Sequence, residues 1–267
     1  MKIRFIGTSG GYPTAKRGTM AMTISSEQAN LLVDCGEGTY REMLTGGISP
    51  LDLTAILISH QHGDHFFGLP GLIWGMHLRD REMPLMIYGP AGLRENLTTI
   101  LSVSGCRPSF QLEIVERTSG DSWQIADLAI ECAAGIHGSM PTLAYRVSKS
   151  AAPAKSPAKN RLGARGAFVY SGDTAPCPEI EALAASAALL AHEATWRSPD
   201  EVPSQAQKHS TASEAAEIAA RAGAKRLLLV HLSPKWVDHS EEILTSARLI
   251  FPETSIPADG DSYIIVD

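Results

Sequence analysis

The sequence predicts a layered α/β fold, in which helices cover β-sheets, and three observations support this prediction. Short apolar runs that are typical of buried strands alternate with helical segments along the chain. The chain has 267 residues, of which 44% are hydrophobic and 19% charged, as in an ordinary globular protein. Several histidines and aspartates directly follow apolar runs, where chains of layered folds leave a sheet and build their sites. We expect a single domain over residues 1–267.

The strands and helices follow from local pattern. A hairpin is expected where apolar runs at Met20–Ser25 and Leu31–Val33 flank a mostly polar turn. A capping box of Thr211 and Glu214 marks one helix start. The other predicted strands are Lys2–Gly7, Leu53–Ile58, Pro84–Tyr88, 110–116, 122–125, 128–133, Ala167–Tyr170, Arg226–Val230 and Tyr263–Val266. The predicted helices are 40–45, Phe66–Leu78, Leu93–Val103, Ala212–Ala222 and one near 239–250.

The loop after the first predicted strand contains a serine within a known hydrolase pattern. Residues 7–11 match the pattern G-x-S-x-G, which in some hydrolases places a nucleophilic serine before a helix. Here Gly10, Gly11 and Pro13 follow the serine, and these residues indicate a loop instead of a helix. We therefore expect a flexible loop whose backbone approaches a ligand or metal ions.

The stretch Ile58–His65 carries the strongest chemical signal. It places His60, His62, Asp64 and His65 within six residues, directly after a predicted buried strand. Imidazole nitrogens and carboxylate oxygens are the ligands that suit zinc and similar divalent ions. A histidine-rich surface loop is the alternative, but this spacing among only nine histidines favours a metal site.

Three more candidate ligands follow other predicted strands, namely His137, Asp173 and His231. His137 alone would more often be a surface residue. If the strands share a sheet system, however, their ends meet at one edge. The seven groups together exceed the four or five ligands of one zinc, so they predict two ions bridged by a carboxylate and a water. His77 and His239 are interpreted as ordinary helix or surface residues.

One segment, Arg146–Gly166, differs in composition from its surroundings. It is rich in Ala, Lys, Pro and Ser, and we predict a short exposed basic loop. Its charges are all positive: Arg146, Lys149, Lys155, Lys159, Arg161 and Arg165. Because the formal net charge of the chain is −6, a polyanion would have to bind through this loop or through the metals. A merely solvated loop explains the composition equally well.

Other sequence features bear on the environment of the protein. The four cysteines are scattered without a C-x-x-C motif, which fits reduced thiols in the cytoplasm. The N-terminus becomes glycine-rich too early for a signal peptide, and no apolar stretch approaches 18 residues. We therefore expect a cytoplasmic protein that does not cross a membrane.

The segment from His60 to His65 has the HxHxDH signature of the metallo-β-lactamase superfamily. The chain more narrowly resembles ribonuclease Z and its arm-less phosphodiesterase relatives. The stretches that carry this resemblance are Phe5–Pro13, Asp34–Thr39, Tyr170–Thr174, His192–Thr195, His209–Thr211 and Leu228–Ser233. The resemblance implies an αββα sandwich and two Zn²⁺ ions, with Mn²⁺ and Fe as alternatives. It implies His60, His62 and His137 on one ion, Asp64, His65 and His231 on the other, and Asp173 between them.

The resemblance also implies a reaction. A dinuclear zinc phosphodiester hydrolase would cut tRNA 3′ trailers or smaller phosphodiesters. Asp64 would orient the attacking water, and His209, backed by Glu193, would protonate the leaving oxygen. A homodimer is also implied.

Two departures from ribonuclease Z weaken the tRNA interpretation. The chain lacks the long arm between the His137 and Asp173 positions, and Ser233–Trp236 differs from the usual Ser-x-Arg-Tyr. The main alternative is a hydrolase of the same fold that acts on a lactone, thioester, carboxylic ester or sulfate ester. A diiron redox enzyme is less favoured, because such relatives carry a glutamate in the stretch where this chain has His62. A binding protein with a degenerate site is disfavoured because all seven ligand candidates are intact.

Overall fold

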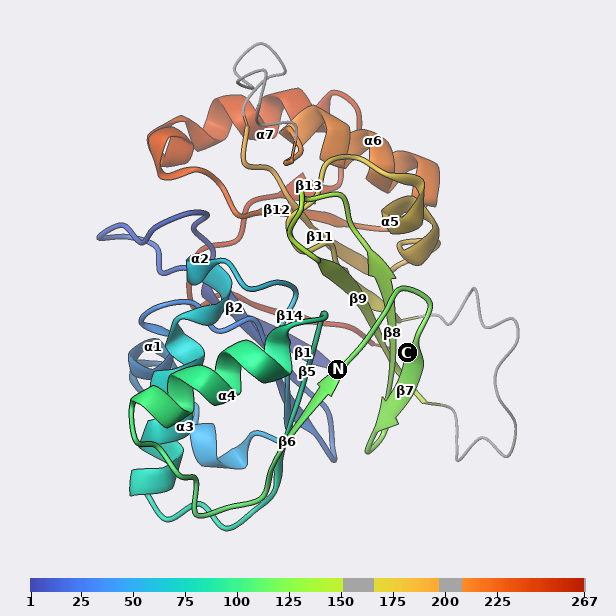
Figure 1. Ribbon diagram of the computed structural model, residues 1–267. Coiled ribbons are helices and arrows are strands. Elements are labelled where there is room, and N and C mark those ends of the chain that lie inside the picture. Colours follow the sequence, from blue (N-terminus) through green and yellow to red (C-terminus); the bar gives the residue numbers. More distant parts are fainter. Residues whose placement is uncertain (151–165, 197–207, 267) are drawn as a thin grey trace.

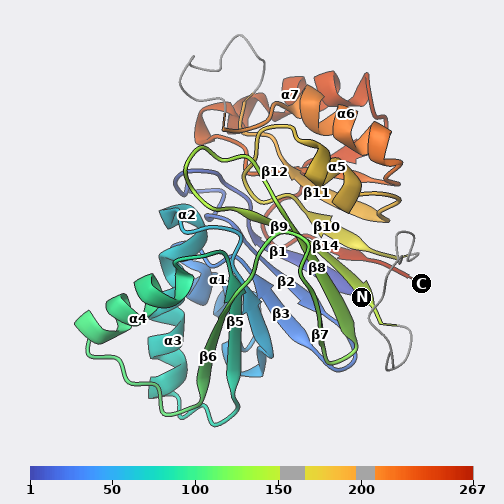
Figure 2. The same ribbon diagram turned by 45° about the vertical axis from the view of Figure 1, so that its right-hand side comes forward.

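Two seven-stranded sheets face each other in the computed structural model, which describes residues 1–150, 166–196 and 208–266. Helices cover the outer face of each sheet, so the layers run helix, sheet, sheet, helix (Figures 1 and 2). This arrangement confirms the layered α/β prediction and the αββα sandwich.

The first sheet contains an antiparallel part and a parallel part. β1, β2 and β3 pair antiparallel, whereas β3, β4, β5 and β6 are parallel to one another. The strands in spatial order are β14 (Ser262–Ile264), β1 (Lys2–Gly7), β2 (Ala21–Ser25), β3 (Asn30–Val33), β4 (Ala55–Leu57), β5 (Leu85–Gly89) and β6 (Leu112–Glu116).

The second sheet has the same mixed construction. β7 to β10 pair antiparallel, and β10 to β13 are parallel. The strands in spatial order are β13 (Thr254–Ser255), β12 (Leu227–Val230), β11 (Leu189–Glu193), β10 (Phe168–Tyr170), β9 (Leu143–Lys149), β8 (Leu128–Ala134) and β7 (Ser122–Ile125). Each sheet thus has parallel strands whose carboxyl ends are free to carry site residues.

A shared apolar core fills the space between the sheets. Phe5 and Leu31 of the first sheet and Tyr145 and Leu228 of the second are buried in it. The Tyr145 hydroxyl also donates a hydrogen bond to the carbonyl of Ile58 across the core, at 2.7 Å. These contacts fix the position of the stretch that carries His60.

Each outer sheet face is covered by its own set of helices. On the first sheet these are α1 (Thr39–Thr45), η1 (Pro50–Asp52), α2 (Gly63–Phe66), α3 (Gly68–Leu78) and α4 (Leu93–Val103). On the second they are α5 (Pro178–Leu183), α6 (Ala212–Ala222), η3 (Pro234–His239) and α7 (Ser240–Arg248). The predicted capping box is present at the start of α6, where Thr211 and Glu214 bond each other's backbone N–H groups.

The predicted start of the basic loop at Arg146 was wrong, because β9 continues through Lys149. Arg146 and Lys149 belong to β9, and Arg146 is buried. The Arg146 guanidinium donates to the carbonyls of Leu183 and Ala185 at 2.9 and 3.0 Å, near the end of α5. Because last-turn carbonyls lack partners within their helix, a buried arginine satisfies them here. Four of the predicted basic residues, Lys155, Lys159, Arg161 and Arg165, lie outside the described residues.

Smaller differences concern element ends. The predicted helix Phe66–Leu78 is divided at Phe67 into α2 and α3. The alanine- and leucine-rich segment near 183–195 holds the end of α5 and the strand β11, which includes Glu193. In the part of the chain that the structure describes, none of the helices is long and apolar enough to traverse a bilayer.

Candidate metal centre

The seven predicted ligands lie together at one edge of the sheets. They follow the carboxyl ends of β4, β8, β10 and β12: His60, His62, Asp64 and His65 after β4, His137 after β8, Asp173 after β10, and His231 after β12. β10, β11 and β12 are parallel neighbours in register, so their last residues stand side by side. Strand register therefore brings together side chains that are far apart in the sequence.

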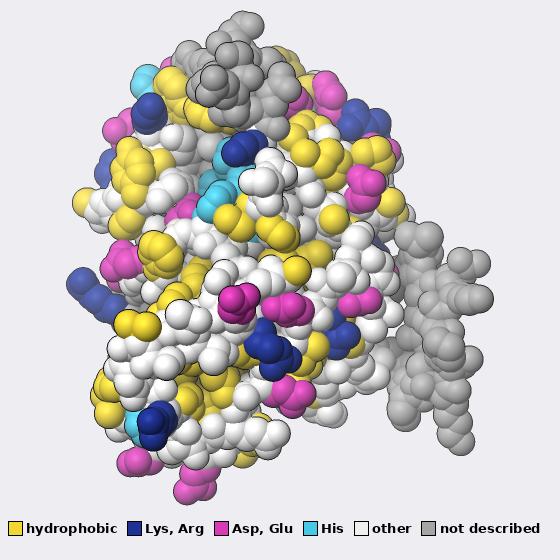
Figure 3. Space-filling view, viewed as in Figure 1, with side chains coloured by type: hydrophobic (Ala, Val, Ile, Leu, Met, Phe, Trp, Pro, Cys, Tyr) yellow, Lys and Arg dark blue, Asp and Glu magenta, His cyan; other side chains and the backbone are white. Residues whose placement is uncertain are grey.

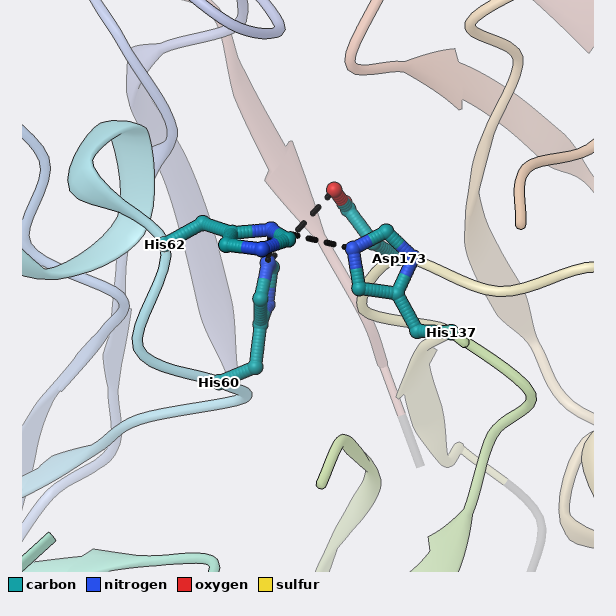
Figure 4. A group of neighbouring side chains, drawn as sticks. All are labelled: His60, His62, His137 and Asp173. Carbon is teal, nitrogen blue, oxygen red and sulfur yellow. Dashed lines mark hydrogen bonds and ion pairs between the residues drawn. The ribbon is translucent and has the colours of Figure 1, made fainter. Parts of the chain in front are cut away.

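The first group consists of His60, His62, His137 and Asp173, which point toward one another in Figure 4. His62 Nδ1 lies 3.1 Å from His60 Nε2 and 3.0 Å from His137 Nε2. Asp173 Oδ2 lies 3.6 Å from His60 Nε2. His60, His137 and Asp173 are buried.

The second group consists of Asp64, His65 and His231. Asp64 Oδ2 lies 3.0 Å from His231 Nε2 and 3.5 Å from His65 Nε2. Asp173 borders this group as well, because its Oδ1 is 3.3 Å from His65 Nε2 and its Oδ2 is 3.2 Å from His231 Nε2. The carboxylate of Asp173 therefore stands between the two groups.

These distances fit metal coordination better than hydrogen bonding. Two ligands of a tetrahedral zinc at 2.0–2.1 Å are separated by about 3.3 Å, close to the separations within each group. His65 Nε2 and Asp173 Oδ1 are buried without a hydrogen-bond partner in the described structure. Such buried atoms are costly unless something binds them. The donor set therefore fits two divalent cations, while the role of each residue as a ligand stays a prediction.

Electrostatics keeps several of the imidazoles unprotonated. Burial lowers the pKa of His60, His62 and His137, and nearby imidazoles lower those of His60 and His62 further. Burial opposes a charge on Asp173, but His231, His65 and His60 hold the pKa of its carboxyl well below the usual range. Neutral imidazoles and ionised carboxylates are the protonation states that bind metal ions.

Asp34 holds His65 in place, and the sequence analysis did not identify it as a site residue. It follows β3 and is buried, in a left-handed conformation with φ 56°. Its carboxylate accepts hydrogen bonds from His65 Nδ1 at 2.7 Å and from the Tyr170 hydroxyl at 2.8 Å. Ser59 donates to it through both its N–H, at 2.7 Å, and its hydroxyl, at 2.8 Å. Burial lowers the pKa of His65, but the negative charges of Asp173, Asp34 and Asp64 outweigh it and raise this pKa well above its usual value. In the neutral form that binds a metal ion, the hydrogen bond to Asp34 would hold the proton of His65 on Nδ1 and present the lone pair of Nε2 to the site.

His231 and His137 also have a partner on the nitrogen that faces away from the site. His231 Nδ1 lies 2.8 Å from the hydroxyl of Thr195, and His137 Nδ1 lies 2.8 Å from the carbonyl of Lys208. The hydroxyl of Thr195 also donates to Glu193 Oε2 at 2.7 Å. Thr195 therefore links the carboxylate of Glu193 to His231. No sequence motif considered above singled out this threonine.

His209 and Glu193 form a pair beside the two groups. His209 Nδ1 lies 2.9 Å from Glu193 Oε1 and 3.8 Å from Asp173 Oδ2. Burial lowers the pKa of His209, but the negative charge of Glu193 and its hydrogen bond outweigh this and raise it to about 9. Because Nδ1 is engaged by Glu193, Nε2 of His209 is the nitrogen that can face a substrate.

The glycine-rich loop of residues 7–13 contacts the site through its backbone. Gly11 N–H donates to Asp64 Oδ2 at 2.5 Å. A Cβ at Gly10 would lie 2.5 Å from the ring of His231, so only glycine fits there. Ser9 is buried, its hydroxyl donates to the carbonyl of Tyr12, and no helix follows, so it is not a nucleophile. The two other histidines, His77 and His239, join neither group.

Comparison with known proteins places the chain in a family. A family model described as "Beta-lactamase superfamily domain" matches residues 29–232. The metallo-β-lactamase fold protein YhfI of Bacillus subtilis has a similar fold, with a TM-score of 0.82 at 24% identity and 98% of each chain covered. The chain therefore belongs to the β-lactamase superfamily, as a hydrolase of the metallo-β-lactamase fold.

The more specific relatives are ribonucleases. Ribonuclease Z of Methanothermobacter thermautotrophicus is 36% identical over 294 residues, which cover 97% of this chain and 95% of the relative. The crystal structure of human tRNase Z, short form, has a TM-score of 0.79 at 27% identity, with both chains fully covered. Within the superfamily, the chain is a ribonuclease Z-like metal-dependent hydrolase.

Proposed function

We propose that this protein is a dinuclear zinc endonuclease that removes the 3′ trailer of tRNA precursors by hydrolysing a phosphodiester bond. One observation carries the proposal: two groups of ligand side chains share Asp173, and the His209–Glu193 pair stands beside them. Such an arrangement suits an in-line displacement, in which a water attacks on one side and an alkoxide departs on the other.

The proposed metal is zinc, because the groups contain five imidazoles and two carboxylates. Zinc favours nitrogen ligands with few carboxylates, whereas magnesium and calcium favour oxygen. His60, His62 and His137 would hold one ion, Asp64, His65 and His231 the other, and Asp173 both. Mn²⁺ and Fe are the alternatives that metal analysis would reveal. Bound ions would supply an acidified water and positive charge for the phosphoryl oxygens.

The protein's own side chains account for orientation and proton transfer. Gly11 N–H fixes one oxygen of Asp64, which leaves this carboxylate oriented toward the attacking water. His209, kept protonated by Glu193, donates its Nε2 proton to the departing oxygen. Glu193 is itself held by Thr195 and by the backbone N–H of Thr174 at 2.7 Å, so the pair is pre-organised before substrate binds.

The choice of tRNA as substrate is supported by the relatives. The Methanothermobacter relative is named ribonuclease Z, and the human protein of similar structure is named tRNase Z. The alignment with the Methanothermobacter relative is 294 residues long although this chain has 267, so that relative contains segments that this chain lacks. We infer that this protein holds its RNA by contacts other than those segments.

The proposal also covers the domain organisation, the oligomeric state and the cellular location of the protein. The chain forms a single domain, since one core joins both sheets. It works as a homodimer, for which the exposed apolar side chains Leu44, Trp74 and Leu78 on α1 and α3 offer a surface. It is cytoplasmic, in keeping with four buried cysteines that form no disulfide.

A paired assay on protein of known zinc content tests the proposal. The two substrates are bis(p-nitrophenyl) phosphate and a precursor tRNA with a 3′ trailer. We expect hydrolysis of both, with a single cut at the trailer junction. Diester hydrolysis with an intact tRNA would restrict the enzyme to small phosphodiesters. If the protein binds two zinc ions but hydrolyses neither substrate, its substrate would instead be a lactone, thioester, carboxylic ester or sulfate ester.

A further inference from the structure

Two histidines of the first group share a local feature that the mechanism does not use. His62 and His137 are each followed by a glycine, and a long side chain occupies the space where the Cβ of that glycine would lie. A Cβ at Gly63 would lie 2.7 Å from Cε2 of Phe67, and one at Gly138 would lie 2.5 Å from Cε of Lys208. Phe67 and Lys208 are therefore packed directly against the metal centre's backbone.

These two side chains come from segments that belong to opposite sheets and rest beside different ligands. His62 and His137 approach each other from different segments in Figure 4, and their facing nitrogens are 3.0 Å apart. Phe67 lies behind His62, between α2 and α3 on the first-sheet side. Lys208 lies behind His137, on the second-sheet side that leads into α6. Figure 3 shows histidine side chains at the surface with a basic side chain directly beside them.

Phe67 is an aromatic ring that the protein leaves uncovered. It is 66% exposed, although the ring edge rests on Gly63 next to His62 and Asp64. Phe66, its neighbour in sequence, is 2% exposed and packs into the core under the first sheet. An exposed ring held rigidly beside a site for RNA hydrolysis is suited to stacking on a base, which tolerates any base sequence.

Lys208 places a positive charge on the other side. Its side chain is exposed, and the ion pairs recorded among the described residues do not include it. Its carbonyl accepts from His137 Nδ1 at 2.8 Å, and the next residue is His209, the proposed proton donor. Gly138 has φ +65° and leaves room for the lysine stem. The ammonium therefore lies beside the backbone that follows His137, and its residue directly precedes the proposed proton donor.

We propose that Phe67 and Lys208 hold a single-stranded RNA segment across the site, Phe67 by stacking on a base and Lys208 by contacting a phosphate on the leaving-group side. This inference rests on the proposed function and names the contacts that position its substrate. A lysine contacts phosphate as a point charge. Each such contact therefore adds a fixed amount to the slope of log affinity against log salt concentration.

The test measures binding separately from cleavage. Fluorescence anisotropy follows a labelled, hydrolysis-resistant 2′-O-methyl phosphorothioate RNA on zinc-loaded protein at several salt concentrations. Lys208→Met is expected to reduce the slope of log affinity against log salt by about 0.7, the value for one phosphate contact on a single strand. Lys208→Arg should restore the slope. Phe67→Leu is expected to weaken binding about tenfold at an unchanged slope, and Phe67→Trp should restore it.

Lys225→Met is the matched control. Lys225 is exposed and precedes β12, at the opposite end of that strand from His231, so its removal should leave the slope unchanged. A slope that Lys208→Met does not alter, or an affinity that Phe67→Leu does not alter, overturns the inference. Failure of the wild-type protein to cut any phosphodiester would instead refute the proposed function, because the binding slopes are obtained without cleavage. Zinc content, measured for every variant, separates a lost contact from a disturbed metal centre.

Discussion

The two sides of the metal centre are built in different ways. On the first-sheet side, four side chains come from the single stretch His60–His65. Asp34 holds His65 of this stretch in place through a hydrogen bond. On the second-sheet side, five side chains come from separate segments: His137 follows β8, Asp173 follows β10, Glu193 ends β11, His231 follows β12 and His209 precedes α6. Local backbone conformation determines the first side, whereas the register of parallel strands determines the second.

Because of this difference, one substitution should disturb more ligands on the first side than on the second. A substitution on the first side disturbs several ligands, because they share one short turn. A substitution on the second side should affect fewer ligands, because these side chains come from separate segments, which Glu193 and Thr195 connect through hydrogen bonds. The predictions below test this contrast, beginning with the largest expected effect.

The substitution His62→Ala should cause the greatest loss. His62 Nδ1 faces both His60 and His137 at 3.0–3.1 Å, so its removal opens the first group. We expect diester hydrolysis to fall more than about 100-fold, beyond the range for outer partners of a metal site, together with reduced zinc content. The control is His77→Ala on α3, outside both groups. Full activity of the His62→Ala variant would mean that the site is misassigned.

His209→Ala should leave metal binding intact while it slows turnover by about 10² to 10⁴, the range for loss of a general acid. The reason is that His209 contacts Glu193 closely but borders Asp173 only at 3.8 Å. Glu193→Gln should produce a smaller defect of the same kind. Atomic absorption and turnover on bis(p-nitrophenyl) phosphate measure the two effects. If zinc is lost in parallel with activity, His209 is a ligand and the contrast between the two sides fails.

Asp34→Asn and Thr195→Val compare the outer contacts of the two sides. Asp34 accepts from His65, Ser59 and Tyr170, and an amide cannot accept from all of these donors. We expect metal affinity or activity to fall by about 10- to 100-fold for Asp34→Asn. Thr195→Val should fall near the lower end of that range, because it removes a single hydroxyl, which contacts Glu193, His231 and His209. A zinc competition titration measures the zinc affinity of both variants. Equal losses of affinity would argue against the contrast between the two sides of the site.

The smallest effect is expected for Thr211→Ala, which removes the cap of α6 without touching the site residues. The lost cap should lower the free energy of unfolding by about 1 kcal/mol. For a chain of this size that corresponds to about 2–4 °C in Tm. Thermal unfolding of zinc-loaded protein measures the shift. A much larger shift would show that the start of α6 supports the preceding His209 as well as the helix.

The contrast between the two sides also explains what could be predicted from the sequence. The HxHxDH stretch is contiguous, so its spacing alone predicts a metal site. The positions of His137, Asp173 and His231 after predicted strands indicated that they join this site. Asp34 and Thr195 lie in stretches that carry the family resemblance, but their roles were missed because an aspartate in a turn and a threonine after a strand do not reveal their partners. Their roles arise only when β3 pairs with β4 in the first sheet and β10, β11 and β12 pair in the second.

Arg146 shows the opposite error. A run of positive charge in a Pro- and Ala-rich segment predicted exposure, yet this arginine is buried in β9 against the carbonyls of Leu183 and Ala185. Composition gives the average environment of a segment and not the partner of an individual side chain. Layer order, most strands and the helices were predictable because each depends on local apolar periodicity.

The position of Asp173 between the two groups has a consequence for how the protein matures. The first group is complete once residues 60 to 173 have folded, but the second needs His231, near the end of the chain. If the two groups hold the proposed ions, a growing chain that leaves the ribosome would complete the two sites in a fixed order. The second proposed ion would be captured only after β12 has joined the sheet, so metal loading would report that this edge of the sheets is finished.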